Sequence, residues 1–220
     1  MVESNDKSER QAELLFERRW EFVMGVPSLD FLPEGEVSEI AFAGRSNVGK
    51  SSLINALLRQ SGIARTSNTP GRTQELNFFR SDGVPLLLVD MPGYGFARAP
   101  KGKVDAWTEL IKDYLRGRQL LRRVFLLIDA RHGLKANDTE IMGMLDTSAV
   151  PYQVVLTKID KLKGGAAERV IAATQDSLKE HPAAVPQVIA TSSEKRIGIS
   201  ELRQAVFSAA LIDPEHFGPV

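Results

Sequence analysis

Short apolar runs alternate with amphipathic stretches along most of the chain. The run at 124–129 is almost entirely apolar, as is typical of a parallel strand covered on both faces. Comparable runs predict further core strands at about 37–43, 152–157 and 187–190. Apolar positions at helical spacing predict helices at about 50–60, 103–116, 137–146, 166–180 and from Ser200 onward. Strands that alternate with helices indicate a doubly wound α/β sheet, whose ligands lie at the carboxyl ends of the strands.

Two segments depart from this alternation. Residues 74–80 and 84–90 are both strand-like, and the Asp82-Gly83 pair between them is a strong hairpin signal, which predicts an antiparallel pair. Residues 22–26 are compatible with an edge strand. We therefore predict a mostly parallel, six-stranded sheet with helices on both faces and one antiparallel strand.

The segment that follows the strand at 37–43 has the form G-x-x-x-x-G-K-S and leads into a helix. Its residues are Gly44, Arg45, Ser46, Asn47, Val48, Gly49, Lys50, Ser51 and Ser52. A loop of this form wraps the phosphates of a nucleotide, because its glycines accept backbone angles that turn successive N–H groups inward. The helix adds the positive end of its dipole. We expect Lys50 to reach the β- and γ-phosphates and the Ser51 hydroxyl to bind Mg²⁺.

A second motif ends the strand at 84–90. Asp90, Met91, Pro92 and Gly93 form D-x-x-G about forty residues after Lys50. A carboxylate in this position can hold Mg²⁺ through water, and the Gly93 N–H can donate to a γ-phosphate and lose that contact on hydrolysis. The motif is weak alone, but downstream of a phosphate loop it predicts a nucleotide-sensing segment.

Two motifs at later strand ends favour guanine as the base. Thr157, Lys158 and Asp160 lie in the sequence T-K-I-D at the end of the strand at 152–157. A carboxylate there accepts two hydrogen bonds from guanine, whereas adenine leaves it unpaired. Further backbone N–H groups that could meet the guanine O6 atom belong to the next strand end, at Thr191, Ser192 and Ser193.

Composition limits the class of protein and its location. The chain has 220 residues, 43% of them hydrophobic and 25% charged, which is typical of a soluble globular protein. It has no apolar run near the roughly 18 residues that span a bilayer and no secretory signal, so we expect a cytoplasmic protein without a membrane partner. The absence of cysteine excludes disulfides and thiolate chemistry. The three histidines stand apart, and we expect them at the surface.

The same features predict one domain. We expect a polar N-terminal extension over residues 1–19, flexible or a frayed helix at its start, a single nucleotide-binding domain over 20–211 and a C-terminal tail over 212–220. We expect a monomer.

The formal net charge of zero hides an uneven distribution. Residues 1–40 carry roughly ten acids and four bases, whereas residues 59–123 carry roughly twelve bases and six acids. The basic segment has two interpretations of equal weight. It is either an ordinary solvated surface or a face for an anionic partner such as RNA, bound through phosphates.

The motifs together resemble those of the EngB (YihA/YsxC) family of bacterial GTP-binding proteins, within the TrmE-Era-EngA-EngB-Septin-like GTPases. The resemblance lies in G-R-S-N-x-G-K-S-S-L-I-N at 44–55, T-P-G-R-T-Q at 69–74, N-F-F at 77–79 and D-M-P-G-Y-G at 90–95. It covers about residues 20–210. It implies a single-domain GTPase that hydrolyses GTP to GDP and assists assembly of the large ribosomal subunit, on which bacterial growth and division depend. The implied partners are GTP or GDP and a precursor of that subunit, through its rRNA or its proteins.

The resemblance also extends the site. It implies that Gly71, Arg72 and Thr73 contact the nucleotide, with Thr73 as a second Mg²⁺ ligand beside Ser51 and with Asp90 acting through water. The residues alone ask only for a hydroxyl within 61–73, and Thr69 remains an alternative.

The catalytic group is left unidentified by these motifs. Ras-like switches place a glutamine after D-x-x-G to orient water, whereas this chain has Tyr94 there, so intrinsic hydrolysis should be slow. Related GTPases that carry an asparagine matching Asn47 use a bound K⁺. Asn47 is therefore a candidate K⁺ ligand, and the competing interpretation is an asparagine that hydrogen-bonds within its own turn.

Two other functions share some of these motifs. A GTP-dependent structural or membrane-associated regulatory module would have the same nucleotide motifs, but the chain lacks a membrane segment, a lipid-anchor motif and long heptads. A kinase would need a phosphate acceptor and a lid, and it would not explain Asp160. We therefore favour a GTP-driven switch in which GTP orders residues 61–73 and 93–103 and hydrolysis releases them.

Overall fold

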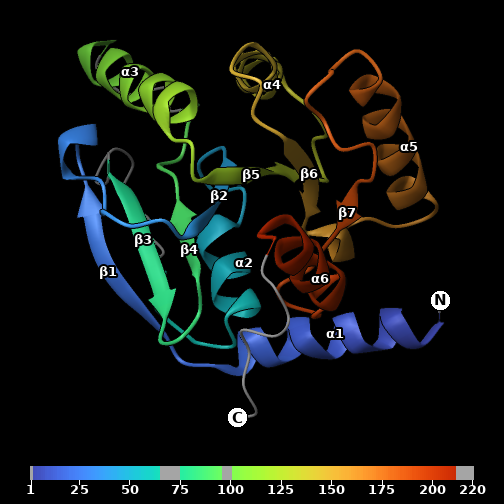
Figure 1. Ribbon diagram of the computed structural model, residues 1–220. Helices are drawn as coiled ribbons and strands as arrows, with labels where there is room; N and C mark the ends of the chain where they lie inside the picture. Colours follow the sequence, from blue (N-terminus) through green and yellow to red (C-terminus); the bar gives the residue numbers. More distant parts are fainter. Residues whose placement is uncertain (1, 65–74, 96–100, 212–220) are drawn as a thin grey trace.

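The computed structural model describes residues 2–64, 75–95 and 101–211, without the side chains of 2–8 and 101–107. The chain folds into one mixed sheet with helices on both faces (Figure 1). The strands are β1 (Trp20–Val26), β2 (Ser38–Gly44), β3 (Leu76–Ser81), β4 (Leu86–Asp90), β5 (Leu121–Asp129), β6 (Tyr152–Thr157) and β7 (Ile189–Ala190). The α-helices are α1 (Val2–Glu17), α2 (Lys50–Leu57), α3 (Lys101–Gly117), α4 (Ala136–Thr147), α5 (Ala166–Leu178) and α6 (Ile199–Ala209), and two 3₁₀ turns are η1 (Leu29–Phe31) and η2 (Ile159–Lys161).

The strand order confirms the predicted fold class. The order is β1-β3-β4-β2-β5-β6-β7, and β3 runs antiparallel to both of its neighbours while the other pairings are parallel. The sheet has seven strands rather than the predicted six, because β1 pairs with β3 from Trp20 to Val26, with a register shift at Val23. Phe22 and Met24 of β1 are exposed, so this edge strand has little of the buried pattern that identifies a core strand.

The core occupies both faces of the sheet, as the alternation of β5 shows. Phe125 and Leu127 belong to the cluster that includes residues of α1, α2 and α6. Val124, Leu126 and Ile128 belong to the cluster with α3, α4 and α5. The two groups of helices lie on opposite faces of the sheet in Figure 1. Such alternation in a continuously apolar strand is what a sheet covered on both faces requires.

The N-terminal segment corrects a prediction. Residues 1–19 were expected to be an extension that is flexible or a frayed helix, but Val2–Glu17 forms α1, and its residues Ala12, Leu15 and Phe16 are fully buried. The Phe16 ring stacks on Trp20 with 5.9 Å between ring centroids. Apolar residues at this spacing form the buried stripe of an amphipathic helix, so α1 is part of the domain core from about Ala12 onward.

The histidines give a second correction. His181 was expected at the surface, but its Nδ1 lies 2.6 Å from a carboxylate oxygen of Asp146, and its ring is mostly covered. His132 is exposed as predicted, and His216 lies outside the described residues. Within the described ranges, we find no helix that is both long and apolar enough to cross a bilayer.

Candidate functional site

The predicted motifs meet at the carboxyl edge of the sheet. Gly44 ends β2, Asp90 ends β4, Thr157 ends β6 and Ala190 ends β7, and these four strands are parallel. Each strand therefore delivers the loop that follows it to the same edge. The structure brings together the segments 44–52, 90–93, 157–160 and 191–193. Thr69, Gly71, Arg72 and Thr73 lie outside the described residues.

The phosphate loop has the backbone that its glycines predict. Gly49 has φ +102° and forms the N-cap of α2, and Asn47 also has a left-handed φ of +63°. At Gly44 a side chain would not fit, because an added Cβ would lie 2.8 Å from Val48 Cγ1 and 3.0 Å from Leu127 Cβ. The first N–H groups of α2 have no partner within the helix, and such groups favour an anion.

Lys50 and Asp90 form an ion pair across this loop, and both side chains are largely covered. A phosphate placed at the loop would offer the Lys50 ammonium a second anion. A hydroxyl and a carboxylate are hard oxygen donors of the kind that Mg²⁺ prefers, and Mg²⁺ sites use few protein ligands together with phosphates. Ser51, next to Lys50, and Asp90 therefore fit the predicted Mg²⁺ site, in which Ser51 would bind the ion and Asp90 would act through water.

The D-x-x-G segment lies against the phosphate loop. An added Cβ at Gly93 would lie 3.1 Å from Ser46 Oγ, so only glycine fits this approach without a shift. The Ser46 N–H donates to the Tyr94 carbonyl at 3.0 Å, and Met91 donates to Phe42 of β2 at 3.0 Å. These bonds continue the pairing of β2 and β4 into their loops. Gly93 thereby lies against Ser46 of the phosphate loop.

The T-K-I-D segment is bonded to the phosphate loop as well. The Thr157 hydroxyl donates to the Val48 carbonyl at 2.7 Å, and Lys158 Nζ donates to the Asn47 carbonyl at 2.6 Å. Lys158 itself has a left-handed backbone, with φ +58°. The base-reading and phosphate-binding segments are therefore a connected unit rather than independent loops.

Asp160 carries the carboxylate predicted to read the base. Its side chain is mostly covered, and a hydrogen bond from the Ser192 hydroxyl, with a smaller contribution from Lys161, lowers its pKa below the usual 3.8. Lys161 Nζ lies 3.1 Å from Asp160 and 2.7 Å from Glu194. The carboxylate is therefore ionised at neutral pH and can accept hydrogen bonds from a ligand.

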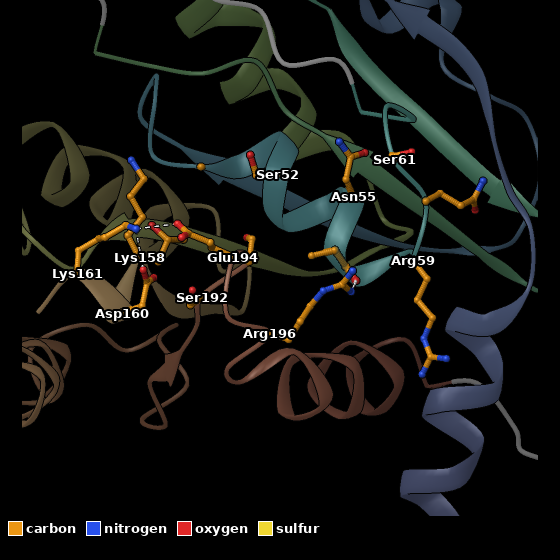
Figure 2. A pocket seen from close by; sticks show the side chains of 15 residues that line it. Ser52, Asn55, Arg59, Ser61, Lys158, Asp160, Lys161, Ser192, Glu194 and Arg196 are labelled. Atoms are coloured by element: carbon orange, nitrogen blue, oxygen red, sulfur yellow. Dashed lines mark hydrogen bonds and ion pairs between the residues drawn. The ribbon is translucent and has the colours of Figure 1, made fainter.

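A cavity of about 630 Å³ opens beside these residues (Figure 2). Asp160, Lys158 and Ser192 lie at one end of it, and its other end reaches Arg59 and Ser61 beyond the C-terminus of α2. Gly49, Thr157 and Ser193 also line it. Thr191 is fully buried, and both its hydroxyl, at 3.0 Å, and its N–H, at 2.6 Å, donate to the Leu156 carbonyl. The cavity is large enough for a ligand the size of a nucleoside.

Asp129 is a site residue that the sequence analysis missed. It ends β5 at the same edge and accepts a hydrogen bond from Lys158 Nζ at 2.9 Å and another from Arg131. Burial raises the pKa of Asp129, but these bonds outweigh burial and hold the pKa well below its usual value. The signal was an acid at the end of an apolar strand, the same signal that identified Asp90.

Comparison with known proteins agrees with this geometry. The family model described as 50S ribosome-binding GTPase matches residues 39–158, and the model of the elongation factor Tu GTP-binding domain matches 108–211. A protein of Sinorhizobium fredii named probable GTP-binding protein EngB is 58% identical over 217 residues, covering 95% of this chain and 99% of the relative. A Bartonella tribocorum protein of the same name is 60% identical over 200 residues, covering 87% and 94%.

Solved structures show the same fold. A crystal structure of a probable GTP-binding protein engB superimposes with a TM-score of 0.63 at 25% identity and covers 79% of this chain and 98% of its own. Era in complex with MgGDPNP and a segment of 16S ribosomal RNA superimposes with a TM-score of 0.61 at 24% identity, covering 80% and 57%. The identity to the curated relatives extends over nearly the whole chain, with the four motifs at one edge of the sheet. The chain therefore belongs to the EngB family of GTP-binding proteins and is a GTPase.

Proposed function

We propose that this GTPase is a nucleotide-controlled switch in the assembly of the large ribosomal subunit. The observation that carries the proposal is the match of residues 39–158, which contain the phosphate loop, the D-x-x-G segment and the first two residues of T-K-I-D, to a family described as 50S ribosome-binding GTPase. In this proposal GTP and hydrolysis to GDP set the conformation of the segments next to the phosphates. A precursor of the large subunit senses that conformation, and the chain acts as a monomer.

The site residues have distinct roles in the proposal. Lys50 and the N–H groups of 44–52 bind the phosphates, and the Gly93 N–H donates to the γ-phosphate. Ser51 and Thr73 bind Mg²⁺, which neutralises charge on the phosphates, and Asp90 contacts it through water. Asp160 accepts the guanine hydrogen bonds. Ser192 orients the Asp160 carboxylate and, with Ser193, lies where backbone N–H groups can meet the guanine O6 atom.

The charge of the middle segment supports an anionic partner only in part. Among the described bases of 59–123, Arg59 pairs with Glu13 and Glu17, and Arg118 pairs with the buried Glu39. The exposed bases Arg80, Arg116 and Arg122 are the described ones that remain for contacts with phosphates. We therefore expect a modest salt dependence of binding to rRNA-containing particles.

Co-sedimentation with precursors of the large subunit tests the proposal. The chain is mixed with purified particles in the presence of a non-hydrolysable GTP analogue, GDP or no nucleotide, over a range of salt. We expect more bound protein with the analogue than with GDP, and a decrease as salt rises. Equal binding in all three nucleotide states would contradict the switch, and a flat salt response would contradict the phosphate contacts.

We also propose that hydrolysis is slow without a stimulating partner or K⁺. Tyr94 occupies the position after D-x-x-G, and its hydroxyl donates to Asp138 at 2.8 Å. Because the hydroxyl is used in this bond, it does not orient the attacking water. Asn47 is exposed, and its side-chain oxygen is a hard donor that suits K⁺. Hydrolysis is measured in K⁺ and Na⁺ buffers with and without ribosomal particles. Equal rates in both salts would exclude K⁺ as an activator.

A further inference from the structure

Tyr94 belongs to a buried cluster that the nucleotide motifs do not account for. Its side chain is nearly inaccessible, and its hydroxyl donates to Oδ1 of Asp138, the third residue of α4, at 2.8 Å. Asp138 is fully buried, and its Oδ2 accepts the Lys135 N–H at 2.9 Å. Arg45 of the phosphate loop places Nε 3.2 Å from the same carboxylate. One buried acid therefore joins the phosphate loop, the D-x-x-G segment and the start of α4.

The backbone of Tyr94 is held from the other side. Its N–H donates to the Gly44 carbonyl at 3.3 Å, and its carbonyl accepts from the N–H of Ser46 at 3.0 Å. Arg45 and Tyr94 form a parallel β-bridge. Gly93, the residue before Tyr94, cannot shift relative to Ser46 unless these bonds break. The next residue, Gly95, has φ +76°, which is a natural point for the chain to change direction.

The chemistry of the cluster favours a permanent anchor. Burial, together with the charge of Asp138, raises the pKa of the Tyr94 hydroxyl far above its ordinary value, and Arg45 offsets only part of this. The hydroxyl therefore stays protonated and donates at every physiological pH. The charge of Asp138 is balanced by Arg45, so the acid tolerates full burial.

We propose that Tyr94 is a positioning residue for GTP hydrolysis: through Asp138 and Arg45 it fixes the Gly93 N–H against the phosphate loop, where it meets the γ-phosphate. The inference rests on the proposed role of Gly93. It follows that Tyr94 sets the preference for GTP over GDP, because only GTP has the phosphate that Gly93 contacts.

The test is Tyr94→Phe, which removes one hydroxyl and keeps the packing of the ring. Affinities for GTP and GDP are measured with fluorescent analogues, and hydrolysis is measured in single turnover. We expect the ratio of GTP to GDP affinity to fall roughly threefold to tenfold, the range that one lost hydrogen bond explains, and the hydrolysis rate to fall with it. GDP affinity should stay unchanged.

The chain contains a matched control. Tyr114 is also fully buried, and its hydroxyl donates to the buried carboxylate of Glu39 at 2.8 Å, with Arg118 paired to the same acid. Glu39 lies near the amino end of β2, away from the nucleotide edge. Tyr114→Phe should lower the thermal midpoint about as much as Tyr94→Phe while leaving both nucleotide affinities as they are. A stability effect is thereby separated from positioning.

A double-mutant cycle with Asp138→Asn tests the route of the effect. Asparagine keeps an acceptor for the Lys135 N–H but loses the charge. If Tyr94 acts through Asp138, the loss in the double variant is smaller than the product of the two single losses. A loss in the double variant equal to the product of the two single losses would contradict this route.

The remaining outcomes are decisive as well. An unchanged GTP to GDP ratio in Tyr94→Phe overturns the inference, and so does an equal loss for both nucleotides, which would show general support of the phosphate loop. Failure of the unmodified chain to bind guanine nucleotides would instead overturn the proposed function. The two failures are therefore distinguishable.

Discussion

The two ends of α2 satisfy the same physical requirement in different ways. At the N-terminal end, the phosphate loop and its N-cap residue Gly49 place the first N–H groups of the helix and Lys50 where they can bind an anion from solution. At the C-terminal end, Arg203 of α6 donates to the carbonyls of Ala56 and Leu57 at 2.9–3.1 Å. The N–H groups at the N-terminal end of α2 are therefore left for a ligand, whereas the carbonyls at its C-terminal end are satisfied by a side chain of the protein itself.

The C-terminal end is bonded to several elements at once. Arg203 also donates to Glu13 of α1 at 2.7 Å, and Glu13 accepts from Ser200 and pairs with Arg59. The Gln60 amide bonds both the N–H and the carbonyl of Trp20, at 2.7 and 2.9 Å. Side chains of α1 and α6 and the backbone of β1 thereby contact the C-terminal end of α2.

Removing Lys50 should have the largest effect on nucleotide binding at the N-terminal end of α2, which we call the ligand end. In Lys50→Ala the phosphates lose a charge-assisted donor, so we expect GTP affinity to fall about 100-fold or more. Asp90 also loses its ionic partner. Isothermal titration with GTP measures the change. Lys112→Ala, which removes a charge paired with Glu109 on α3, is the control and should bind as the native chain does.

At the C-terminal end of α2, removing Arg203 should have the largest effect on the stability of the fold. Arg203→Met leaves the last carbonyls of α2 without these donors and deprives Glu13 of its buried partner. We expect the free energy of unfolding in urea to fall by about 3 kcal/mol. Arg116→Met replaces an exposed arginine in the last turn of α3 and should cost less than about 0.5 kcal/mol. Equal losses in the two variants would show that burial of the cap does not matter.

Glu13 should give a smaller effect that depends on pH. Burial raises the pKa of Glu13, but the Ser200 hydrogen bond and the charges of Arg203 and Arg59 outweigh it, so the pKa lies below 4.5. A lowered pKa contributes stability above pH 4.5, and this contribution is lost as pH falls through the folded value. Glu13→Gln should therefore cost less than about 1 kcal/mol at pH 7 and less still near pH 3. Urea unfolding at both values checks it, and a loss independent of pH would refute the electrostatic origin.

The ligand end could be predicted from the sequence because its determinants are local. Gly44, Gly49 and Lys50 lie within one short segment, and Asp90 and Asp160 end apolar strands whose parallel order follows from the alternation. The left-handed backbone of Gly49 and the room for Gly93 are requirements that only glycine meets without strain or displacement. These residues therefore reveal the site without any knowledge of distant contacts.

The rest required contacts between distant residues. Glu13 meets Arg203 from 190 positions away, and Tyr94 meets Asp138 from 44. Neither pair has a sequence signature, because a buried ion pair or side-chain hydrogen bond needs only that two elements pack together. For α1 a signal was present, since Ala12, Leu15 and Phe16 have the spacing of a buried helical face within a polar segment. The many charged residues of the segment 1–19 drew attention away from this apolar spacing.

The central claim is that the carboxyl edge of the sheet binds a guanine nucleotide through Asp160. The most direct measurement is fluorescence competition of GTP, GDP and ATP on the native chain and on Asp160→Asn, with xanthine nucleotides added for the variant. We predict that GTP and GDP displace the probe where ATP does not, and that the variant shifts its preference toward xanthine nucleotides. Equal competition by ATP on the native chain would contradict the claim and reduce the segment at 157–160 to a turn.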